Sequence, residues 1–370
     1  MTARGSDMNA PLVLIAAGGT GGHVYPALAV ADELLQRGYR VEWVGTRRGL
    51  ENRVVPEAGI TLHTLPVRGL RGKSVLYKLR AAIVLVMAVV RALCLLLRRR
   101  PACVVGLGGF ASGPAGVAAW LLRKPLVIHE QNALAGTTNR MLQRFAKRIL
   151  AGFPGAFGPG VDYEVPGNPL RRELVDAAAN LHYDYDGQRP LNLLVLGGSL
   201  GAAPINDSMP GMVRRLMRDG GAGFAIRHQT GELHIDVVRE RYGDLLGPTV
   251  RVEPFIEDMA EAYAWADLVL CRAGALTISE LALMGRPSIL VPLPHAIDDH
   301  QTLNARTLST HGAAVIILQN QMDAYKLCTL LRDFMADPGK LRAMAAAAAA
   351  QATPHAAEHV ADCCEALINA

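Results

Sequence analysis

The strongest constraint on the fold is a regular alternation of short, apolar, β-rich segments with longer helical segments along the whole chain. Continuous apolar strands separated by helices are typical of parallel sheets that are covered on both faces. The sequence therefore predicts an α/β protein. The predicted strands are Leu12–Ala17, Arg40–Val44, Thr61–Leu65, Ala102–Val105, Leu126–His129, Arg148–Leu150, Leu191–Leu196, Phe224–Arg227, Val250–Val252, Leu268–Cys271, Ser288–Val291 and Ala314–Ile317.

The two halves of the chain resemble each other. Leu12–His23 reads LVLIAAGGTGGH and Leu191–Ala202 reads LNLLVLGGSLGA, so each is a strand, a double glycine, a small hydroxyl residue and then a helix. GLGGFASG at Gly106–Gly113 and CRAGALTISE at Cys271–Glu280 again follow a buried strand. This pattern predicts two Rossmann-like domains with parallel sheets. We expect a ligand in the cleft between them, at the carboxyl ends of the strands.

The length of 370 residues favours two domains over one. The segment Gly152–Arg189, rich in Gly, Pro, Asp and Tyr, is the predicted linker. We expect an N-terminal domain over residues 1–165 and a C-terminal domain over residues 166–345. The alanine-rich segment 346–370 is predicted to be a helix that packs back on the body.

Composition excludes several classes of protein. Hydrophobic residues make up 51% and charged residues 19%, which indicates a globular chain and not a disordered one. A net charge of only +5 argues against a nucleic-acid binder and allows an anionic surface or substrate. The apolar run Leu12–Ala17 is too short to span a membrane and has no cleavage site, which favours a cytoplasmic protein.

The six cysteines form no CxxC pair, and Cys363 and Cys364 are adjacent, a spacing that suits neither a zinc site nor an ordinary disulfide. We therefore predict six free thiols in a reducing compartment.

The loop Gly18–His23 contains four glycines, which allow the backbone to approach a ligand at a helix N-terminus, where free N–H groups favour anions. It lacks the lysine of a P-loop, and Val24 breaks the GxGxxG pattern. His23 is its only titratable side chain, and an unperturbed imidazole suits a general base near neutral pH. The alternatives are a tight turn and a structural histidine.

The loop Gly197–Gly201 has two interpretations. As a phosphate loop, Ser199 and the following helix N-terminus would hold a diphosphate. As GxSxG, it matches the nucleophile elbow of serine hydrolases, with Asp267 or Asp298 and then His300 completing the triad. We favour the phosphate loop, because the N-terminal glycine loop has no role in a hydrolase.

Gly106–Ala111 matches the loose GxGxxA form of a dinucleotide site, and Glu130 follows at the end of another strand. A nicotinamide-dependent oxidoreductase therefore stays open, although Gly113-Pro114 is expected to delay the next helix.

His129–Asn132 places four polar residues at the end of a strand, which indicates either a ligand site or a capping cluster. Glu280 is expected in the first turns of a helix, where its carboxylate can bind ribose hydroxyls or remain a solvated surface group.

The stretch Arg68–Arg100 combines nine basic residues with the nearly apolar segment Ala81–Leu97. It is too short and too charged for a spanning helix, and an interfacial anchor on an anionic membrane fits better. A buried helix between strands is the alternative. The basic residues are Arg68, Arg71, Lys73, Lys78, Arg80, Arg91, Arg98, Arg99 and Arg100.

Over roughly Leu12 to Ala305 the chain resembles one family, whose motifs occur in the same order. The family is that of the UDP-N-acetylglucosamine:N-acetylmuramyl-(pentapeptide) pyrophosphoryl-undecaprenol N-acetylglucosamine transferases, which form lipid II. The resemblance implies a GT-B fold and an inverting mechanism without a bound metal or other cofactor. The motifs are GGTGGHVYP, HEQNALAGTTNR, GNPLR, GGSLGA, HQTG, PFIEDM, RAGALTISE and DDHQTLNA.

The resemblance also implies roles for individual residues. His23 is the candidate base and Glu130 the second choice. The diphosphate would be held by Arg171 and Ser199, and the uracil would pack near Ile256. His300, in place of a glutamine, and Phe110, in place of a tyrosine, depart from the family pattern. The remaining implied binding residues are Thr20, Gly21, Gly22, Asn132, Ala275, Leu276, Thr277, Ile278, Ser279, Glu280 and Gln301.

The implied partners are UDP-N-acetylglucosamine, the undecaprenyl-linked muramyl-pentapeptide, an anionic membrane surface and other wall-synthesis proteins, with no nucleic acid. The implied location is the cytoplasmic face of the bacterial inner membrane.

Overall fold

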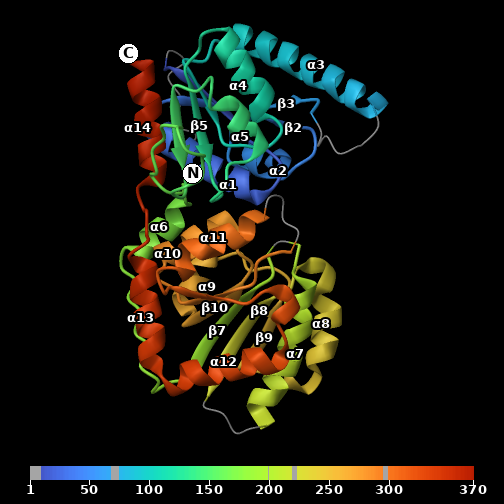
Figure 1. Ribbon diagram of the computed structural model, residues 1–370, viewed down its shortest axis with the longest axis vertical. Helices are drawn as coiled ribbons and strands as arrows, with labels where there is room; N and C mark the ends of the chain where they lie inside the picture. The colour runs from blue at the N-terminus through green and yellow to red at the C-terminus, as the bar shows by residue number, and fades with distance from the viewer. Residues whose placement is uncertain (1–9, 68–74, 199, 219–222, 295–298) are drawn as a thin grey trace. The chain divides into compact units, whose positions relative to one another are not determined.

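The computed structural model describes residues 10–67, 75–198, 200–218, 223–294 and 299–370, and only the backbone of 75–81 (Figure 1). It divides into two compact units. The first contains residues up to Arg171 together with Pro354–Ala370, and the second is Arg172–Thr353. These divisions fall later in the chain than the predicted ends at residues 165 and 345.

Six parallel strands form the sheet of the first unit, in the order β3-β2-β1-β4-β5-β6. The prediction of an α/β architecture is confirmed. The strands are β1 (Leu12–Ala16), β2 (Arg40–Thr46), β3 (Thr61–Leu65), β4 (Cys103–Gly106), β5 (Leu126–Glu130) and β6 (Arg148–Ala151). The helices are α1 (Gly21–Gln36), α2 (Glu51–Glu57), α3 (Val75–Arg99), α4 (Ser112–Leu121), α5 (Thr137–Leu142) and α14 (Ala356–Ile368).

Helices cover both faces of this sheet, which explains why its central strand is apolar throughout. All of β1 is buried: Val13 and Ile15 face a core shared with α1 and α14, whereas Leu14 and Ala16 face a core shared with α3 and α4. Side chains alternate between the faces of a strand, so a strand covered on both sides carries no polar positions.

The second unit repeats the same topology, with the strand order β12-β11-β10-β7-β8-β9. If β7 is matched to β1 and β10 to β4, the strands of the two sheets follow in the same order. The strands are β7 (Leu191–Leu196), β8 (Phe224–Gln229), β9 (Val250–Glu253), β10 (Leu268–Cys271), β11 (Ser288–Leu290) and β12 (Ala314–Ile316). The helices are α6 (Arg172–Ala178), α7 (Ala203–Arg218), α8 (Ile235–Tyr242), α9 (Met259–Trp265), α10 (Ala275–Leu283), α11 (His300–Ser309), α12 (Ala324–Ala336) and α13 (Pro338–Ala349).

The last helix, α14, belongs to the first unit although it follows the second in sequence. Val360, Ala361 and Cys364 join the core beside β1 and α1. Arg37, the C-cap residue of α1, also donates a hydrogen bond to Asp362 at 2.6 Å. The chain therefore passes from the first unit to the second and back again.

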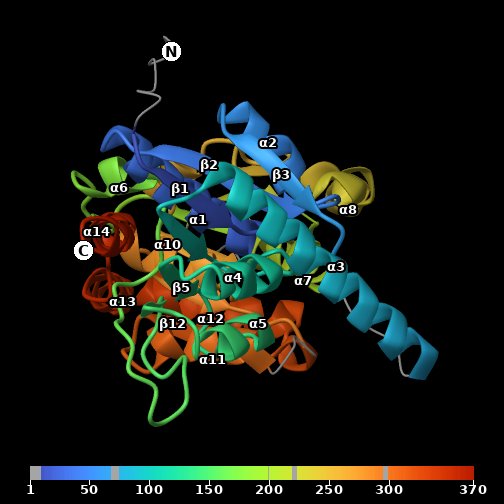
Figure 2. The ribbon, with the colours of Figure 1, turned by 90° about the horizontal axis from the view of Figure 1, so that it is seen from above.

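Helix α3 presents an unusual surface. Ala88, Ala92 and Leu96 are buried against the neighbouring α4, but the opposite face is also apolar and exposed. That face carries Ile83, Val86, Met87, Val90 and Leu97. The N-terminal part of α3 projects beyond the rest of the unit (Figures 1 and 2). In the described part of the chain, no helix is long and apolar enough to cross a membrane.

Candidate active site

Both sheets have a topological switch point between their central strands. In the first unit it lies between β1 and β4, and in the second between β7 and β10. In open α/β sheets the carboxyl ends of strands at such a point form the binding crevice. The four glycine-containing motifs predicted from the sequence all follow these four strands, so the fold brings them together in pairs within each unit.

Steric requirements account for part of the glycine content of the first loop. Gly19 has a φ of +102°, which side chains rarely adopt. A Cβ on Gly18 would lie 2.6 Å from the Glu51 carboxylate, and one on Gly109 in the next loop would lie 2.2 Å from the Gly18 carbonyl oxygen. At Gly22 the nearest atom would be 3.7 Å away. Part of the glycine content therefore builds the turn itself.

Glu51 anchors this loop, a role that the sequence analysis did not identify. Its buried carboxylate accepts hydrogen bonds from the Gly19 N–H at 2.9 Å and from the backbone and hydroxyl of Thr46 at 2.9 and 2.7 Å. Burial alone would raise the pKa of Glu51, but these donors outweigh it and hold the pKa below its usual range. The glycine loop is thus held by a fixed negative charge behind it.

His23 lies at the start of α1 and begins a chain of hydrogen bonds. Its Nδ1 is 2.8 Å from Oε1 of Gln131, and Nε2 of Gln131 is 3.1 Å from Nδ1 of His129. Nε2 of His129 is in turn 2.9 Å from the carbonyl oxygen of Gly167. The His23 ring also packs on Gly108, where a Cβ would lie 2.9 Å from Nδ1.

This chain fixes the tautomer of His23. Burial lowers the pKa of His129 to about 4, so its ring is neutral and carries one proton. A carbonyl oxygen only accepts, so that proton is on Nε2, and Nδ1 of His129 must accept from the Gln131 amide. Oε1 of Gln131 then accepts from Nδ1–H of His23. The neutral His23 ring consequently keeps its lone pair on Nε2, which has no hydrogen-bond partner among the described residues.

Glu130 is the second candidate base. Both of its carboxylate oxygens accept hydrogen bonds from residues of the loop that follows it. One carboxylate oxygen accepts from the backbone and side-chain nitrogens of Asn132 at 3.0 and 3.2 Å. The other accepts from the Gly136 N–H at 3.0 Å and the Asn139 amide at 2.9 Å. These contacts agree with the capping-cluster alternative for Glu130.

The other predicted residues of the first unit lie around the same loop. Thr20 is exposed and is the N-cap of α1, while Gly21 and Gly22 form its first turn. The guanidinium of Arg171 lies over the ring of Tyr25, one turn further along α1, at 5.5 Å. Asn132 is half-buried and is oriented by Glu130. The structure therefore gathers these residues with His23.

In the second unit Ser199 lies outside the described residues. Its neighbours show a tightly packed loop: a Cβ on Gly201 would lie 2.1 Å from the Thr230 carbonyl oxygen. Ile256 is buried in the segment between β9 and α9.

Helix α10 brings together the residues predicted for ribose and sugar. It begins at Ala275, where Gly274 is an N-cap without a side-chain hydrogen bond, and Leu276 and Thr277 of its first turn are half-buried. Ile278 and Ser279 are buried, and the Ser279 hydroxyl donates to the Ala275 carbonyl.

Two neighbouring elements hold this helix in place. Tyr263 on α9 donates a hydrogen bond to the Glu280 carboxylate at 2.9 Å. Asn304 on α11 donates to the Ala273 carbonyl just before α10. Gln301, on the first turn of α11, accepts from the Leu293 N–H at 2.9 Å. Glu280 is therefore not the freely solvated group of the alternative interpretation.

The structure weakens two alternatives in part. Asp267 immediately precedes β10, at the edge of the sheet opposite to the loop after β7. It is buried and paired with Arg189 at 2.6 Å, which argues against a triad through Asp267. Asp298, the other candidate, lies outside the described residues, as Ser199 does. For a dinucleotide site, the Glu130 carboxylate is already occupied. The expected delay before α4 is also wrong: the helix starts at Ser112 and holds Pro114 in its first turn, where proline is tolerated.

Comparison with known proteins decides the family. The glycosyltransferase family 28 N-terminal domain matches residues 13–151, and the C-terminal domain of the same family matches residues 192–360. This chain belongs to glycosyltransferase family 28. The sequence-based recognition of the family is thereby confirmed.

Relatives within family 28 match nearly the whole chain. Proteins of Alkalilimnicola ehrlichii and Pseudomonas putida are each 50% identical over 352 residues, 95% of this chain and 98% and 96% of theirs. Both are named UDP-N-acetylglucosamine--N-acetylmuramyl-(pentapeptide) pyrophosphoryl-undecaprenol N-acetylglucosamine transferase. The crystal structure of Acinetobacter baumannii MurG matches with a TM-score of 0.80 and 38% identity, over 96% of this chain and 99% of that one.

More distant glycosyltransferase structures share the fold alone. VinC in complex with dTDP is 15% identical to this chain, with a TM-score of 0.67. The GT-B assignment, two Rossmann-like units within one glycosyltransferase, is confirmed by these comparisons.

Proposed function

We propose that this chain transfers N-acetylglucosamine from UDP-N-acetylglucosamine to the 4-hydroxyl of undecaprenyl-pyrophosphoryl-N-acetylmuramyl-pentapeptide, the step that forms lipid II in peptidoglycan synthesis. Its membership of family 28 and its 50% identity to transferases of that name support the reaction. The single structural observation that carries the mechanism is the hydrogen-bond chain that keeps a lone pair on Nε2 of His23.

In the proposed mechanism the muramyl hydroxyl attacks the anomeric carbon as the bond to UDP breaks, so the configuration inverts. Nε2 of His23 takes the hydroxyl proton. As that proton arrives, the ring becomes a cation, and Nδ1–H stays hydrogen-bonded to Oε1 of Gln131. Glu130 holds the loop that positions Gln131 and Asn132.

Negative charge grows on the diphosphate as UDP leaves. Arg171 and Ser199 would hold the diphosphate, together with backbone N–H groups at the N-termini of α1, α7 and α10, because helix N-termini favour anions. At the N-terminus of α1, the backbone would be that of Thr20, Gly21 and Gly22.

The nucleoside and sugar would be bound by the second unit. Ile256 would pack near the uracil, and Glu280, oriented by Tyr263, would accept from ribose hydroxyls. Ala275–Ser279 and Gln301 would line the sugar, with Asn132 of the first unit.

We further propose that the chain associates with an anionic membrane surface through α3, at the cytoplasmic face of the inner membrane. The exposed apolar face of α3 carries Ile83, Val86 and Val90, and exposed Arg91 lies beside it. Arg99 does not contribute to the positive charge that α3 would present to the membrane, because it is paired with buried Glu42. Arg68, Arg71 and Lys73, which the sequence analysis included, lie outside the described residues, as do the side chains of Lys78 and Arg80.

The reaction is tested by mixing the enzyme with UDP-N-acetylglucosamine and the lipid-linked muramyl-pentapeptide, then following UDP release and the product's anomeric configuration by NMR. We expect a β-linked product from the α-linked donor. A retained configuration would contradict the single displacement, and hydrolysis without transfer would contradict the proposed acceptor.

Membrane association is tested by sedimentation with vesicles of phosphatidylglycerol and phosphatidylcholine. Ile83→Gln, Val86→Gln and Val90→Gln together should release the protein, since each buried aliphatic side chain is worth about 1.5–3 kcal/mol. The matched control changes Leu233 and Val237, exposed apolar residues of the second unit, to Gln. Equal sedimentation of both variants would place the anchor elsewhere.

A further inference from the structure

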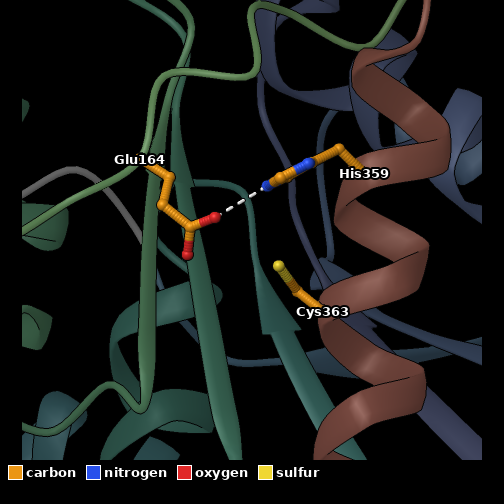
Figure 3. Close-up of side chains that lie close together, drawn as sticks. All are labelled: Glu164, His359 and Cys363. Carbon is orange, nitrogen blue, oxygen red and sulfur yellow. Dashed lines mark hydrogen bonds and ion pairs between the residues drawn. The ribbon is translucent and has the colours of Figure 1, made fainter.

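Three side chains with metal-ligand chemistry meet where α14 packs on the first unit. Nε2 of His359 lies 2.8 Å from Oε2 of Glu164, and these atoms and the Cys363 sulfur all lie within 4.8 Å of one another. Figure 3 shows the three side chains converging, with His359 and Cys363 on α14 and Glu164 on the facing segment. We propose that Glu164, His359 and Cys363 form a Zn²⁺ site, which we call the C-terminal clip.

The arrangement along the chain suits coordination. His359 and Cys363 are four residues apart on one helix, so they lie on the same face one turn apart. Glu164 pairs with the end of the first sheet through a bridge to Leu150. Two ligands from a helix and one from a backbone segment fixed to the sheet give a site whose donors are positioned before the metal arrives.

The donor set selects the metal. Imidazole and thiolate ligands favour zinc and similar transition metals, whereas Mg²⁺ and Ca²⁺ prefer sites made only of oxygen. One carboxylate and one thiolate supply two negative charges, which balance a divalent cation. Arg148 contacts the other oxygen of Glu164, Oε1, at 3.2 Å and leaves Oε2 for the metal.

Small side-chain movements would complete the geometry. Ligand atoms around tetrahedral zinc lie ~3.4 Å apart, so the His359–Glu164 contact opens slightly and the sulfur moves inward. Such movements are possible because the side chains of Glu164 and His359 are 40% and 42% exposed. This exposure also gives water access to the fourth coordination position.

Binding removes two protons from ligand atoms. The proton that Nε2 of His359 donates to Glu164 moves to Nδ1 of a neutral ring, or to solvent from a charged one, and the Cys363 sulfur loses the other. Burial, and then the charge of Glu164, raises the pKa of the Cys363 thiol to about 11. Zn²⁺ therefore forms its bond to sulfur as the thiol proton leaves to solvent, a step that structural zinc sites drive by the strength of the metal–sulfur bond.

The position of the clip suggests its role. Glu164 lies shortly before the chain leaves the first unit at Arg171, and His359 lies shortly after it returns at Pro354. A metal here would join the two connecting segments and hold α14 on the first unit. This role is structural and separate from the proposed transfer chemistry.

The test uses the full chain, stripped of metal and titrated with Zn²⁺ or with Co²⁺ as a spectroscopic probe. We expect one equivalent to bind, with a cobalt–thiolate charge-transfer band. At a free metal concentration of 100 times Kd, the melting temperature of the first unit should rise by roughly 5–10 °C.

Variants locate the site. Cys363→Ser should abolish the cobalt–thiolate band, and His359→Gln and Glu164→Gln, which change partly exposed side chains, should each weaken binding at least tenfold. His355→Gln, at the exposed N-cap of α14, and Cys94→Ser, an exposed cysteine of α3, are the matched controls and should bind as the wild type does.

Absence of binding by the wild type would show that His359 and Glu164 form an ion pair only, and would overturn the proposal. A band that survives Cys363→Ser, or one lost in Cys94→Ser, would also overturn it.

Discussion

The two units share one strand order but differ in what they place at the switch point. In the first unit, a series of hydrogen bonds lies there and links His23 through Gln131 to the buried His129. The second places the N-terminus of α10 there, with the Glu280 carboxylate held by Tyr263. The same topology can therefore support proton transfer in one copy and binding of a nucleotide sugar in the other.

The largest expected effect is on the proton-transfer side. His23→Ala should lower turnover by about a hundredfold to ten-thousandfold, the usual contribution of a general base, with little change in the donor's Michaelis constant. His63→Ala is the matched control, since His63 lies in the same unit but pairs with Glu42. Turnover at saturating donor and acceptor, with a melting curve for each preparation, checks both.

A well-folded His23→Ala variant that retains more than about a tenth of wild-type turnover would exclude His23 as the essential base. Gln131→Leu tests the role of the hydrogen-bond chain, because it removes the group that fixes the His23 tautomer while leaving the imidazole present. It should lower turnover less than His23→Ala does.

The counterpart in the second unit is Glu280→Ala, which should weaken UDP binding by about 1.5–3 kcal/mol, the worth of a hydrogen bond to a charged group. Calorimetry measures this. Tyr263→Phe is the control: it removes the hydroxyl that contacts Glu280 but keeps the carboxylate, so UDP affinity should change less. Equal losses in both variants would assign Glu280 a structural role.

Sensitivity to acid should be alike in the two units. Burial lowers the pKa of His129 to about 4 and that of His228, in the second unit, to about 3. As the pH falls, these histidines bind protons in the unfolded chain before they do so in the folded protein. Their contribution to the free energy of unfolding is therefore fully present above pH ~6.5 and is lost as the pH drops towards their folded-state pKa values. The expected loss is about 2 kcal/mol per histidine at pH 5. Urea unfolding at pH 7 and pH 5 measures the loss, and unchanged midpoints would contradict it.

The smallest effect concerns the sugar. UDP-N-acetylglucosamine should bind about fivefold more tightly than UDP-glucose, because the acetamido group adds roughly one hydrogen bond, worth about 1 kcal/mol. Thermal-shift titrations with both nucleotides test this. Equal stabilisation would show that the α10 region does not recognise the acetamido group.

The fold followed from the sequence because its determinants are local. Apolar runs such as Leu12–Ala17 and Leu191–Leu196 report burial on both faces of a strand directly, and glycines mark the turns after them. The ends of Rossmann-like strands also identify the site in general terms, which is why His23 and the α10 segment could be named in advance.

The details that were missed depend on residues far apart in the chain. Glu51 contacts Gly19 across 32 positions, and Gln131 contacts His23 across 108. No periodicity reports such contacts. Cysteine spacing likewise argued against zinc at Cys363, whereas the proposed site uses Glu164, which contacts His359 across 195 positions.

The return of α14 to the first unit has a consequence for biosynthesis. Val360 and Cys364 complete a core that β1 begins, yet they are translated after the whole second unit. At 5–20 residues per second, the roughly 200 residues between β6 and α14 take about 10–40 s to make. Until α14 is made, Val13 and Ile15 lack part of their cover, whereas residues 172–353 are complete before α14. The second half of this protein is thus able to finish folding on the ribosome before the first half does.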